Sequence, residues 1–144
     1  MSSVGDPYFD TSALVPLVVE EPGSPRTARL WDSASRVVSA RIVYAEARAA
    51  FAQAHRMQRL TARALRRAVS EFELIYRQLD RVEIDERLVR RAGQLAEQHA
   101  LRGYEAVHLA AAQRLHDAQT VLVSGDAALC RAARALGMAV SAWD

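Results

Sequence analysis

Short apolar segments alternate with longer amphipathic segments along the chain, and this alternation constrains the fold more than any other feature of the sequence. Each short segment has the length and residue types of a strand, and the longer segments repeat their apolar residues at helical spacing. Strands separated by helices usually pair in parallel, so the pattern predicts an α/β fold. We expect a three-layer structure in which a parallel sheet of about five strands is flanked by helices. The predicted strands are Tyr8–Phe9, Arg36–Ser39, Val82–Ile84, Thr120–Val123 and Ala139–Ser141.

Residues that commonly begin or end helices mark the helix boundaries. Ser39 is expected to cap a helix over about residues 40–57, and Gly137 is expected to end the last helix of the chain. The helix over residues 40–57 and the next one should form an antiparallel hairpin, because only a short loop separates them. The remaining helices are predicted over about residues 25–33, 61–79, 104–116 and 127–136, with a further one that begins at residue 85 or 86.

The size and composition of the chain indicate one globular domain. The sequence has 144 residues, of which 51% are hydrophobic and 25% are charged, so we predict a single domain over residues 1–144. No apolar stretch reaches the length of a membrane span and the first residues lack the pattern of a signal peptide, so we expect a cytoplasmic protein with no membrane partner. The single cysteine, Cys130, has no Cys or His at metal-ligand spacing and is interpreted as a packed thiol.

The basic residues are all arginine, and the chain contains neither lysine nor asparagine. Without lysine, a phosphate-binding loop, a Schiff-base enzyme and a receiver-type phosphotransfer site cannot operate in their ordinary forms. The net charge of +2 is compatible with a polyanionic substrate but is too small to indicate one. Five arginines at the tip of the predicted hairpin are interpreted as a solvated surface, with RNA or an acidic partner as the alternative: Arg56, Arg59, Arg63, Arg66 and Arg67.

Four acidic residues occupy positions where a carboxylate needs a partner. Asp10 and Asp126 directly follow predicted strands, and the carboxyl ends of parallel strands share one edge of the sheet, where open α/β folds bind ligands. Glu46 is expected about two turns into a helix, and Glu105 less than one turn into another, and both helices start from this edge or pack beside it. We therefore expect the four side chains to meet although they are far apart in the sequence.

Such a cluster needs either protons or a cation. Two like charges ~4 Å apart cost roughly 4 kcal/mol at an effective dielectric constant near 20. An all-oxygen site suits Mg²⁺, or Mn²⁺, better than zinc, and such an ion makes hydrolysis of a nucleic-acid backbone chemically possible. Thr11 and Ser12 would supply hydroxyl groups that orient Asp10 or a water on the metal. His99 and His108 have apolar neighbours on helices, and we interpret them as packed or hydrogen-bonded residues rather than catalysts.

Each acid also has a structural explanation. Asp126 can be a helix N-cap, Asp10 can be an ordinary turn residue, and a carboxylate in the first turn, as at Glu105, interacts favourably with the helix dipole. Glu46 is harder to explain, because it lies within an apolar stripe and needs a buried partner. The arginines that could serve as this partner are Arg41 and Arg102.

Four motifs resemble those of a known family. They are Phe9–Leu14 (FDTSAL), Glu46 within a helix, Tyr104–Ala110 (YEAVHLA) and Leu122–Leu129 (LVSGDAAL). In order and spacing the series resembles the PIN-domain ribonucleases, and most of all the VapC toxins of bacterial toxin–antitoxin pairs. The resemblance implies a PIN-like fold and a Mg²⁺-dependent endoribonuclease that cuts RNA, often forms a homodimer and is inhibited by a cognate VapB-like antitoxin. It also implies metal-binding and catalytic roles for Asp10, Glu46, Glu105 and Asp126, with Thr11 or Ser12 as the supporting hydroxyl.

One residue departs from the family pattern. The third motif usually has Asp where this chain has Glu105, and the longer side chain moves the carboxylate by about one methylene group. Two hypotheses follow from this difference. The first is an active endoribonuclease, in which Glu105 assists the other three acids. The second is a catalytically weak PIN-like module that acts by binding a protein partner.

Overall fold

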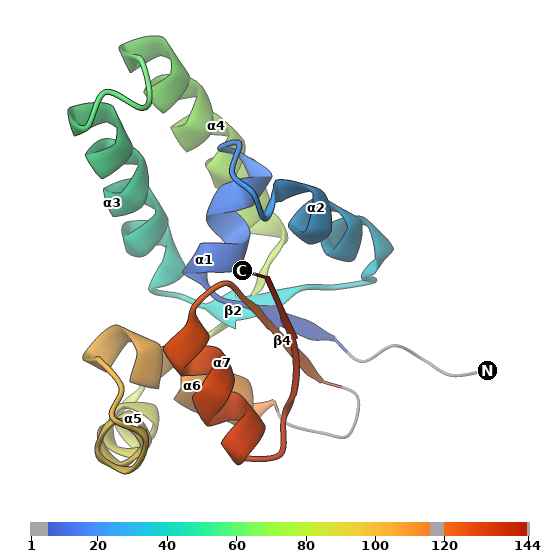
Figure 1. Ribbon diagram of the computed structural model, residues 1–144, viewed down its shortest axis with the longest axis vertical. Helices are drawn as coiled ribbons and strands as arrows, with labels where there is room; N and C mark the ends of the chain where they lie inside the picture. Colours follow the sequence, from blue (N-terminus) through green and yellow to red (C-terminus); the bar gives the residue numbers. More distant parts are fainter. Residues whose placement is uncertain (1–5, 116–119, 144) are drawn as a thin grey trace.

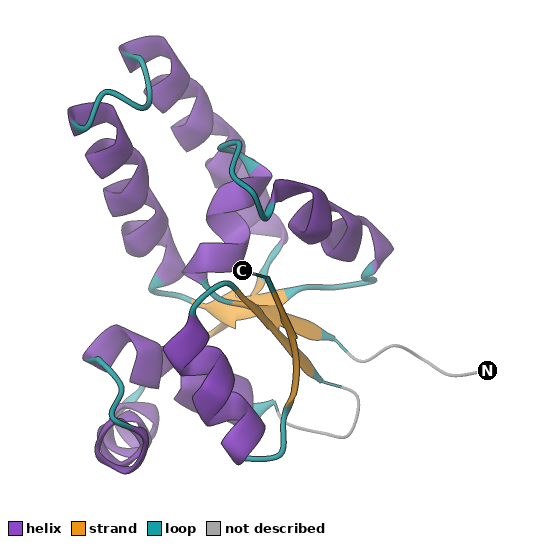
Figure 2. Ribbon diagram, in the orientation of Figure 1, coloured by secondary structure: helices purple, strands orange, loops and turns teal. Residues whose placement is uncertain are grey.

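The computed structural model describes residues 6–115 and 120–143, and within them five strands form a single parallel sheet (Figures 1 and 2). The strands are β1 (Pro7–Phe9), β2 (Val38–Ala40), β3 (Asp80–Val82), β4 (Val121–Ser124) and β5 (Ala139–Ala142). The helices are α1 (Thr11–Leu14), the 3-10 turn η1 (Val15–Leu17), α2 (Ser24–Ser33), α3 (Val43–Arg56), α4 (Ala62–Gln78), α5 (Glu86–His99), α6 (Gly103–Arg114) and α7 (Ala127–Ala135).

The order of the strands places a switch point in the middle of the sheet. The strands follow the order β3-β2-β1-β4-β5, and every neighbouring pair is parallel. After β1 the chain builds β2 and β3 on one side and then crosses over to build β4 and β5 on the other. The carboxyl ends of β1 and β4 therefore lie side by side where the strand order reverses, which is the usual ligand position in an open α/β sheet.

Different helices cover the two faces of the sheet, and successive residues of the central strands alternate between these faces. On β1, Tyr8 packs into a core with residues of α5, α6 and α7, whereas Phe9 packs into a second core with residues of α1, α3 and α4. Leu122 and Val123 on β4 divide in the same way. Figure 1 shows α1 to α4 on one side of the sheet and α5 to α7 on the other. The predicted three-layer α/β fold is confirmed.

The helices α3 and α4 form the predicted hairpin, which extends away from the sheet (Figure 1). Phe51 and Phe72 join the two helices through an edge-on ring contact, with 5.7 Å between the ring centroids. Gln58 adopts a positive φ of 63° in the connecting turn. The five arginines predicted at the tip are all exposed, in agreement with a solvated surface.

The predicted cap at Ser39 is wrong. Ser39 is a buried residue of β2, and its hydroxyl donates a hydrogen bond of 2.6 Å to the carbonyl oxygen of Phe9 on the neighbouring strand. A turn at residues 41–42 follows the strand, so α3 begins at Val43 rather than near residue 40. As a result Glu46 lies in the first turn of α3, closer to the edge of the sheet than the sequence indicated.

The bounds of β2 and β3 differ most from the predictions, because backbone pairing rather than hydropathy sets them. Strand β2 begins two residues later than predicted, and β3 occupies Asp80–Val82 instead of Val82–Ile84. The register pairs Val38 with Asp80 and Ala40 with Val82. Asp80 is exposed and polar, so its place in a strand leaves no apolar signal in the sequence.

Several local predictions agree with the structure. Thr61, Asp85 and Asp126 each accept a backbone hydrogen bond at a helix N-terminus, and Gly137 has a φ of 82° after the last helix. Cys130 is buried, as expected. The helix predicted to reach residue 116 ends at Arg114, and residue 116 itself lies outside the described residues. Among the described helices, none combines the length and the apolar character needed to span a membrane.

Candidate active site

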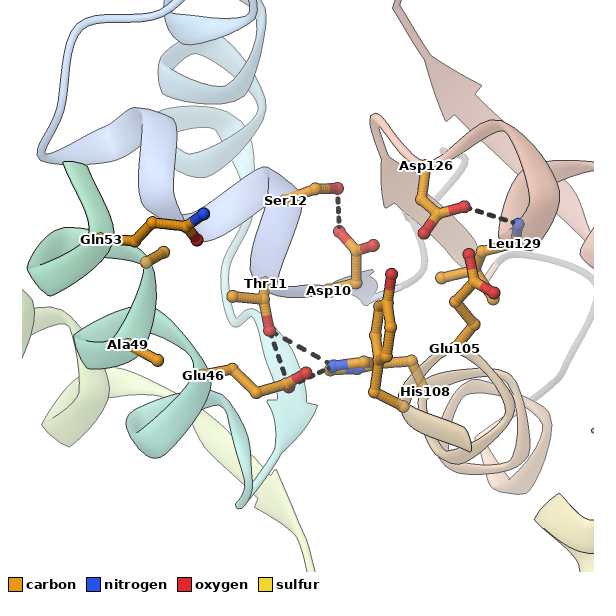
Figure 3. Close-up of a pocket in the computed structure, with 12 residues that line it drawn as sticks. Asp10, Thr11, Ser12, Glu46, Ala49, Gln53, Glu105, His108, Asp126 and Leu129 are labelled. Atoms are coloured by element: carbon orange, nitrogen blue, oxygen red, sulfur yellow. Dashed lines mark hydrogen bonds and ion pairs between the residues drawn. The ribbon is translucent and has the colours of Figure 1, made fainter. Parts of the chain in front are cut away.

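A pocket with a volume of about 450 Å³ opens at the carboxyl ends of β1 and β4. All six residues that the sequence singled out line it, although they come from four separate segments of the chain. Figure 3 shows Asp10 between two groups, with Glu46 on one side and the pair Glu105 and Asp126 on the other. The structure thus brings the four predicted acids to one cavity.

Asp10 is held at the end of β1 by hydrogen bonds to both of its carboxylate oxygens. Oδ1 accepts from the Ser12 hydroxyl at 2.7 Å and from the backbone N–H of Ala13 at 3.1 Å, which makes Asp10 the N-cap of α1. Oδ2 accepts from the Ser124 hydroxyl at 2.6 Å. The residue is only 4% exposed, and burial raises the pKa of Asp10, although His108 and then the hydroxyls of Ser124 and Ser12 lower it in part.

Glu105 and Asp126 form the second group, and each caps a helix. The Oδ1 atom of Asp126 accepts from the Leu129 N–H at 3.0 Å, and the Oε1 atom of Glu105 accepts from the Arg102 N–H at 2.8 Å. Burial raises the pKa of Glu105, and the nearby carboxylate of Asp126 raises it further. Each of these residues therefore both caps a helix and lines the pocket, and the carboxyl group of Asp126 is close enough to change the pKa of Glu105.

Glu46 has polar partners on two other elements. Its Oε1 atom accepts from the Thr11 hydroxyl at 2.8 Å and lies 2.7 Å from Nε2 of His108 on α6. The Oε2 atom has no hydrogen-bond partner among the described residues. No buried side-chain oxygen of the described residues lacks a partner, so Oε2 is open to the pocket.

Neither of the arginines suggested as a partner for Glu46 fills that role. Arg41 forms an ion pair with Glu83, and Arg102 lies over the ring of Tyr104 with its guanidinium carbon 6.0 Å from the ring centroid. Both arginines are exposed. The alternative explanation of Glu46, a buried arginine partner, is therefore not what the structure shows, because Thr11 and His108 are its partners.

Sequence reasoning missed two residues of the site. His108 is hydrogen-bonded, as predicted, but it lines the same pocket as the acids. Its place three residues after Glu105 puts both side chains on one face of α6, and this spacing was a usable signal. Ser124 gave a weaker signal. It precedes Asp126 by two residues, and only the pairing of β4 with β1 brings it to Asp10.

The donor set of the pocket suits a hard divalent cation. The pocket is lined by four carboxyl groups, and the pKa values of two of them, Asp10 and Glu105, are raised. A bound cation would stabilise the ionised form of both groups. As the side chains lie, no three His, Cys, Asp or Glu residues in the described part of the chain are close enough together to hold one ion.

The fold and the site define a three-layer α/β domain with a carboxylate-lined pocket at the switch point of its sheet. The family model described as PIN domain matches residues 8–135, and the chain belongs to that family. The chain is 40% identical over 134 residues to Ribonuclease VapC49 of Mycobacterium tuberculosis (strain ATCC 25618 / H37Rv), covering 93% of each protein. It is 36% identical over 135 residues to Ribonuclease VapC46 of the same strain, covering 94% of this chain and 95% of the relative. The resemblance to PIN domains and VapC proteins is confirmed.

Solved structures agree with this assignment at the level of the fold. The chain is similar to a chain in DNA-bound VapBC from Salmonella typhimurium, with a TM-score of 0.65, 16% identity and coverage of 96% and 98%. It is also similar to a chain in FitAcB from Neisseria gonorrhoeae, with a TM-score of 0.65, 18% identity and coverage of 93% and 95%. At such low identities the likeness supports the shared architecture alone.

Proposed function

We propose that this protein is a Mg²⁺-dependent endoribonuclease, able to use Mn²⁺ as well, and the toxin of a toxin–antitoxin pair. The observation that carries the proposal is that four carboxylates, from four separate segments, line one pocket at the switch point of the sheet. Relatives that are 36–40% identical over nearly the whole chain bear the name ribonuclease. These two facts favour hydrolysis of RNA over other chemistry on the same fold.

The charge of the pocket supports dependence on a cation. The described residues that line it include four acids and no arginine, so a phosphodiester would meet only negative charge there. Asp10, Glu46, Glu105 and Asp126 would hold the ion. When bound, a divalent cation supplies Lewis acidity toward the phosphodiester and lowers the pKa of water to make a nucleophile.

The neutral side chains of the pocket would keep the carboxylates in position. Ser12 fixes one oxygen of Asp10 and also accepts the N–H of Gly125 at 2.8 Å, which ties α1 to the turn before Asp126. Thr11 fixes one oxygen of Glu46. These hydroxyls have a positioning role, because their protons point at the carboxylates and not into the cavity.

An antitoxin is the protein partner that fits the pocket. The structural neighbours include complexes named VapBC and a complex named as toxin–antitoxin from Klebsiella pneumoniae. An acidic cavity with no arginine among its described lining residues is complementary to an inserted arginine or lysine, which would compete with the metal and with RNA. We further propose that the protein forms a homodimer, which sedimentation of the free protein would test.

The proposal is tested by cleavage of single-stranded RNA with the purified protein, with Mg²⁺ and with a chelator. Asp10→Asn should abolish cleavage, whereas the matched change Asp32→Asn, at an exposed position on α2, should leave it intact. Cleavage that persists in chelator and in Asp10→Asn would refute the proposal. Tight binding of an antitoxin without any turnover by the parent would instead favour the partner-binding module.

A further inference from the structure

We propose that Tyr8 and His108 form a buried hydrogen-bond chain that positions the carboxylate of Glu46. The inference deepens the proposed function, because Glu46 is one of the four acids assigned there to the cation. The phenol oxygen of Tyr8 lies 2.8 Å from Nδ1 of His108, and Nε2 of the same ring lies 2.7 Å from Oε1 of Glu46. Three elements that are distant in sequence, β1, α6 and α3, are connected through one imidazole ring (Figure 3 shows its contact with Glu46).

The donor and the acceptor in each hydrogen bond follow from the chemistry of the two groups that form it. An ionised carboxylate only accepts, so Nε2 of His108 must carry the proton that faces Glu46. Tyr8 is fully buried, and burial together with the negative charges of Asp10 and Glu46 raises the pKa of Tyr8 well above its usual value. The phenol therefore keeps its proton and can donate it to Nδ1. The chain therefore runs from Tyr8 through Nδ1 and the Nε2–H of His108 to Glu46.

The surroundings leave this chain little freedom to move. His108 is 2% exposed, and its ring stands edge-on to the ring of Tyr8, at 71° and 5.9 Å between centroids. Tyr8 lies on the central strand of the sheet, within the core that α5, α6 and α7 cover. A rigid donor is thus anchored in the core and aimed outward at the pocket.

The consequence for Glu46 is a fixed orientation. A glutamate side chain has several rotatable bonds, and holding it in one rotamer costs conformational entropy when a ligand has to impose that rotamer. Here His108 and Thr11 both engage Oε1, so Oε2 is left to face the cavity. His108 is therefore a positioning residue, comparable to the outer-shell partners that orient metal ligands in other proteins.

The first test measures the hydrogen bonds themselves in metal-free protein. Long-range proton–nitrogen NMR spectra distinguish a ring nitrogen that carries a proton from one that does not. We expect His108 to show a protonated Nε2 and an unprotonated Nδ1, and Tyr8→Phe to shift the Nδ1 resonance, because that nitrogen loses its hydrogen-bond donor. A protonated Nδ1 in the parent, or no change in Tyr8→Phe, would overturn the proposal.

The second test separates the donor from the space that it fills. His108→Gln retains an N–H donor that can reach Glu46, whereas His108→Leu has a similar volume and no donor. We expect the Leu variant to bind Mn²⁺ about 10- to 100-fold more weakly than the parent, and the Gln variant to recover most of that loss. His99→Leu, at a half-buried position on α5 that does not line the pocket, is the matched control and should bind Mn²⁺ like the parent.

The outcomes distinguish the positioning role from packing and from the proposed function. Circular dichroism confirms that each variant is folded, and equal Mn²⁺ affinity of the Gln and Leu variants would contradict a donor role. If the parent neither cleaves RNA nor binds Mn²⁺, the proposed function fails. The ring spectra of the metal-free protein would still decide whether the hydrogen-bond chain exists.

Discussion

Replacing Ser124 by alanine should lower the free energy of unfolding by about 2 to 4 kcal/mol at neutral pH. The Ser124 side chain is fully buried, and its hydroxyl donates to Oδ2 of Asp10 at 2.6 Å and accepts from the N–H of Asp126 at 3.0 Å. A hydrogen bond to a charged group contributes about 1.5–3 kcal/mol, and a neutral one contributes about 0.5–1.5 kcal/mol. Alanine removes both bonds, so the buried carboxylate of Asp10 loses one hydrogen-bond donor.

The loss should depend on pH, and its sign follows from the pKa of Asp10. Burial raises this pKa above the unfolded value, so the folded state binds a proton more readily and the free energy of unfolding falls as pH rises between the two values. The Ser124 hydroxyl lowers the pKa of Asp10, and removing it raises that pKa further. Ser124→Ala should therefore destabilise the protein more at neutral pH than near pH 4, where Asp10 is more often protonated.

Urea denaturation of the metal-free protein, followed by circular dichroism at about pH 4 and about pH 7, measures the effect. Ser33→Ala is the matched control, because the Ser33 hydroxyl is exposed and donates only to a carbonyl of its own helix. The control should change the free energy of unfolding by less than about 0.5 kcal/mol. Equal destabilisation by Ser124→Ala at both pH values would show that the hydroxyl does not stabilise the ionised form of Asp10.

Four further outcomes are expected. Asp10→Asn should abolish RNA cleavage without lowering the thermal midpoint of the metal-free protein, because it removes a buried charge and its amide can donate to Ser124. Glu105→Gln should raise that midpoint, because it relieves the repulsion with Asp126, and should weaken Mn²⁺ binding in calorimetry. Mg²⁺ at 100 times its dissociation constant should raise the free energy of unfolding by about 2.7 kcal/mol, an increase that chelator reverses in urea titrations. Phe72→Ala should cost about 3–5 kcal/mol by the same titrations, because its buried ring contacts both helices of the hairpin.

The layers of the fold could be predicted because the strands carry a strong local signal. Leu122 and Val123 point to opposite faces of β4 and both are apolar, which is typical of a strand covered by helices on each side. The edge strand β3 shows the limit of this reasoning. Its first residues, Asp80 and Arg81, are polar, and they form a strand because β2 offers them hydrogen-bond partners. Hydropathy carries no information about such pairing.

The site shows a similar division between local and distant information. Asp10 and Asp126 could be placed at the pocket because each follows a strand that the sequence makes evident. Their partners could not be placed in this way. Ser124 reaches Asp10 across 114 positions of the chain, and His108 reaches Glu46 across 62. Only the order of the strands and the packing of α6 determine these contacts, and a single sequence reveals neither directly.

The structural and functional explanations of the acids turn out to be complementary. Asp126 uses Oδ1 to cap α7, and Glu105 uses Oε1 to close the first turn of α6. A carboxylate that binds a helix N-terminus through one oxygen has its orientation set by the backbone, and the capped helix contributes partial positive charge that offsets part of the repulsion between neighbouring acids. Capping thus lets several carboxylates remain together at one edge of a sheet before any cation is bound. Glu46 is the exception, because its side chain makes no capping hydrogen bond although it lies in the first turn of α3. It is the acid for which the fold supplies a buried tyrosine and histidine instead.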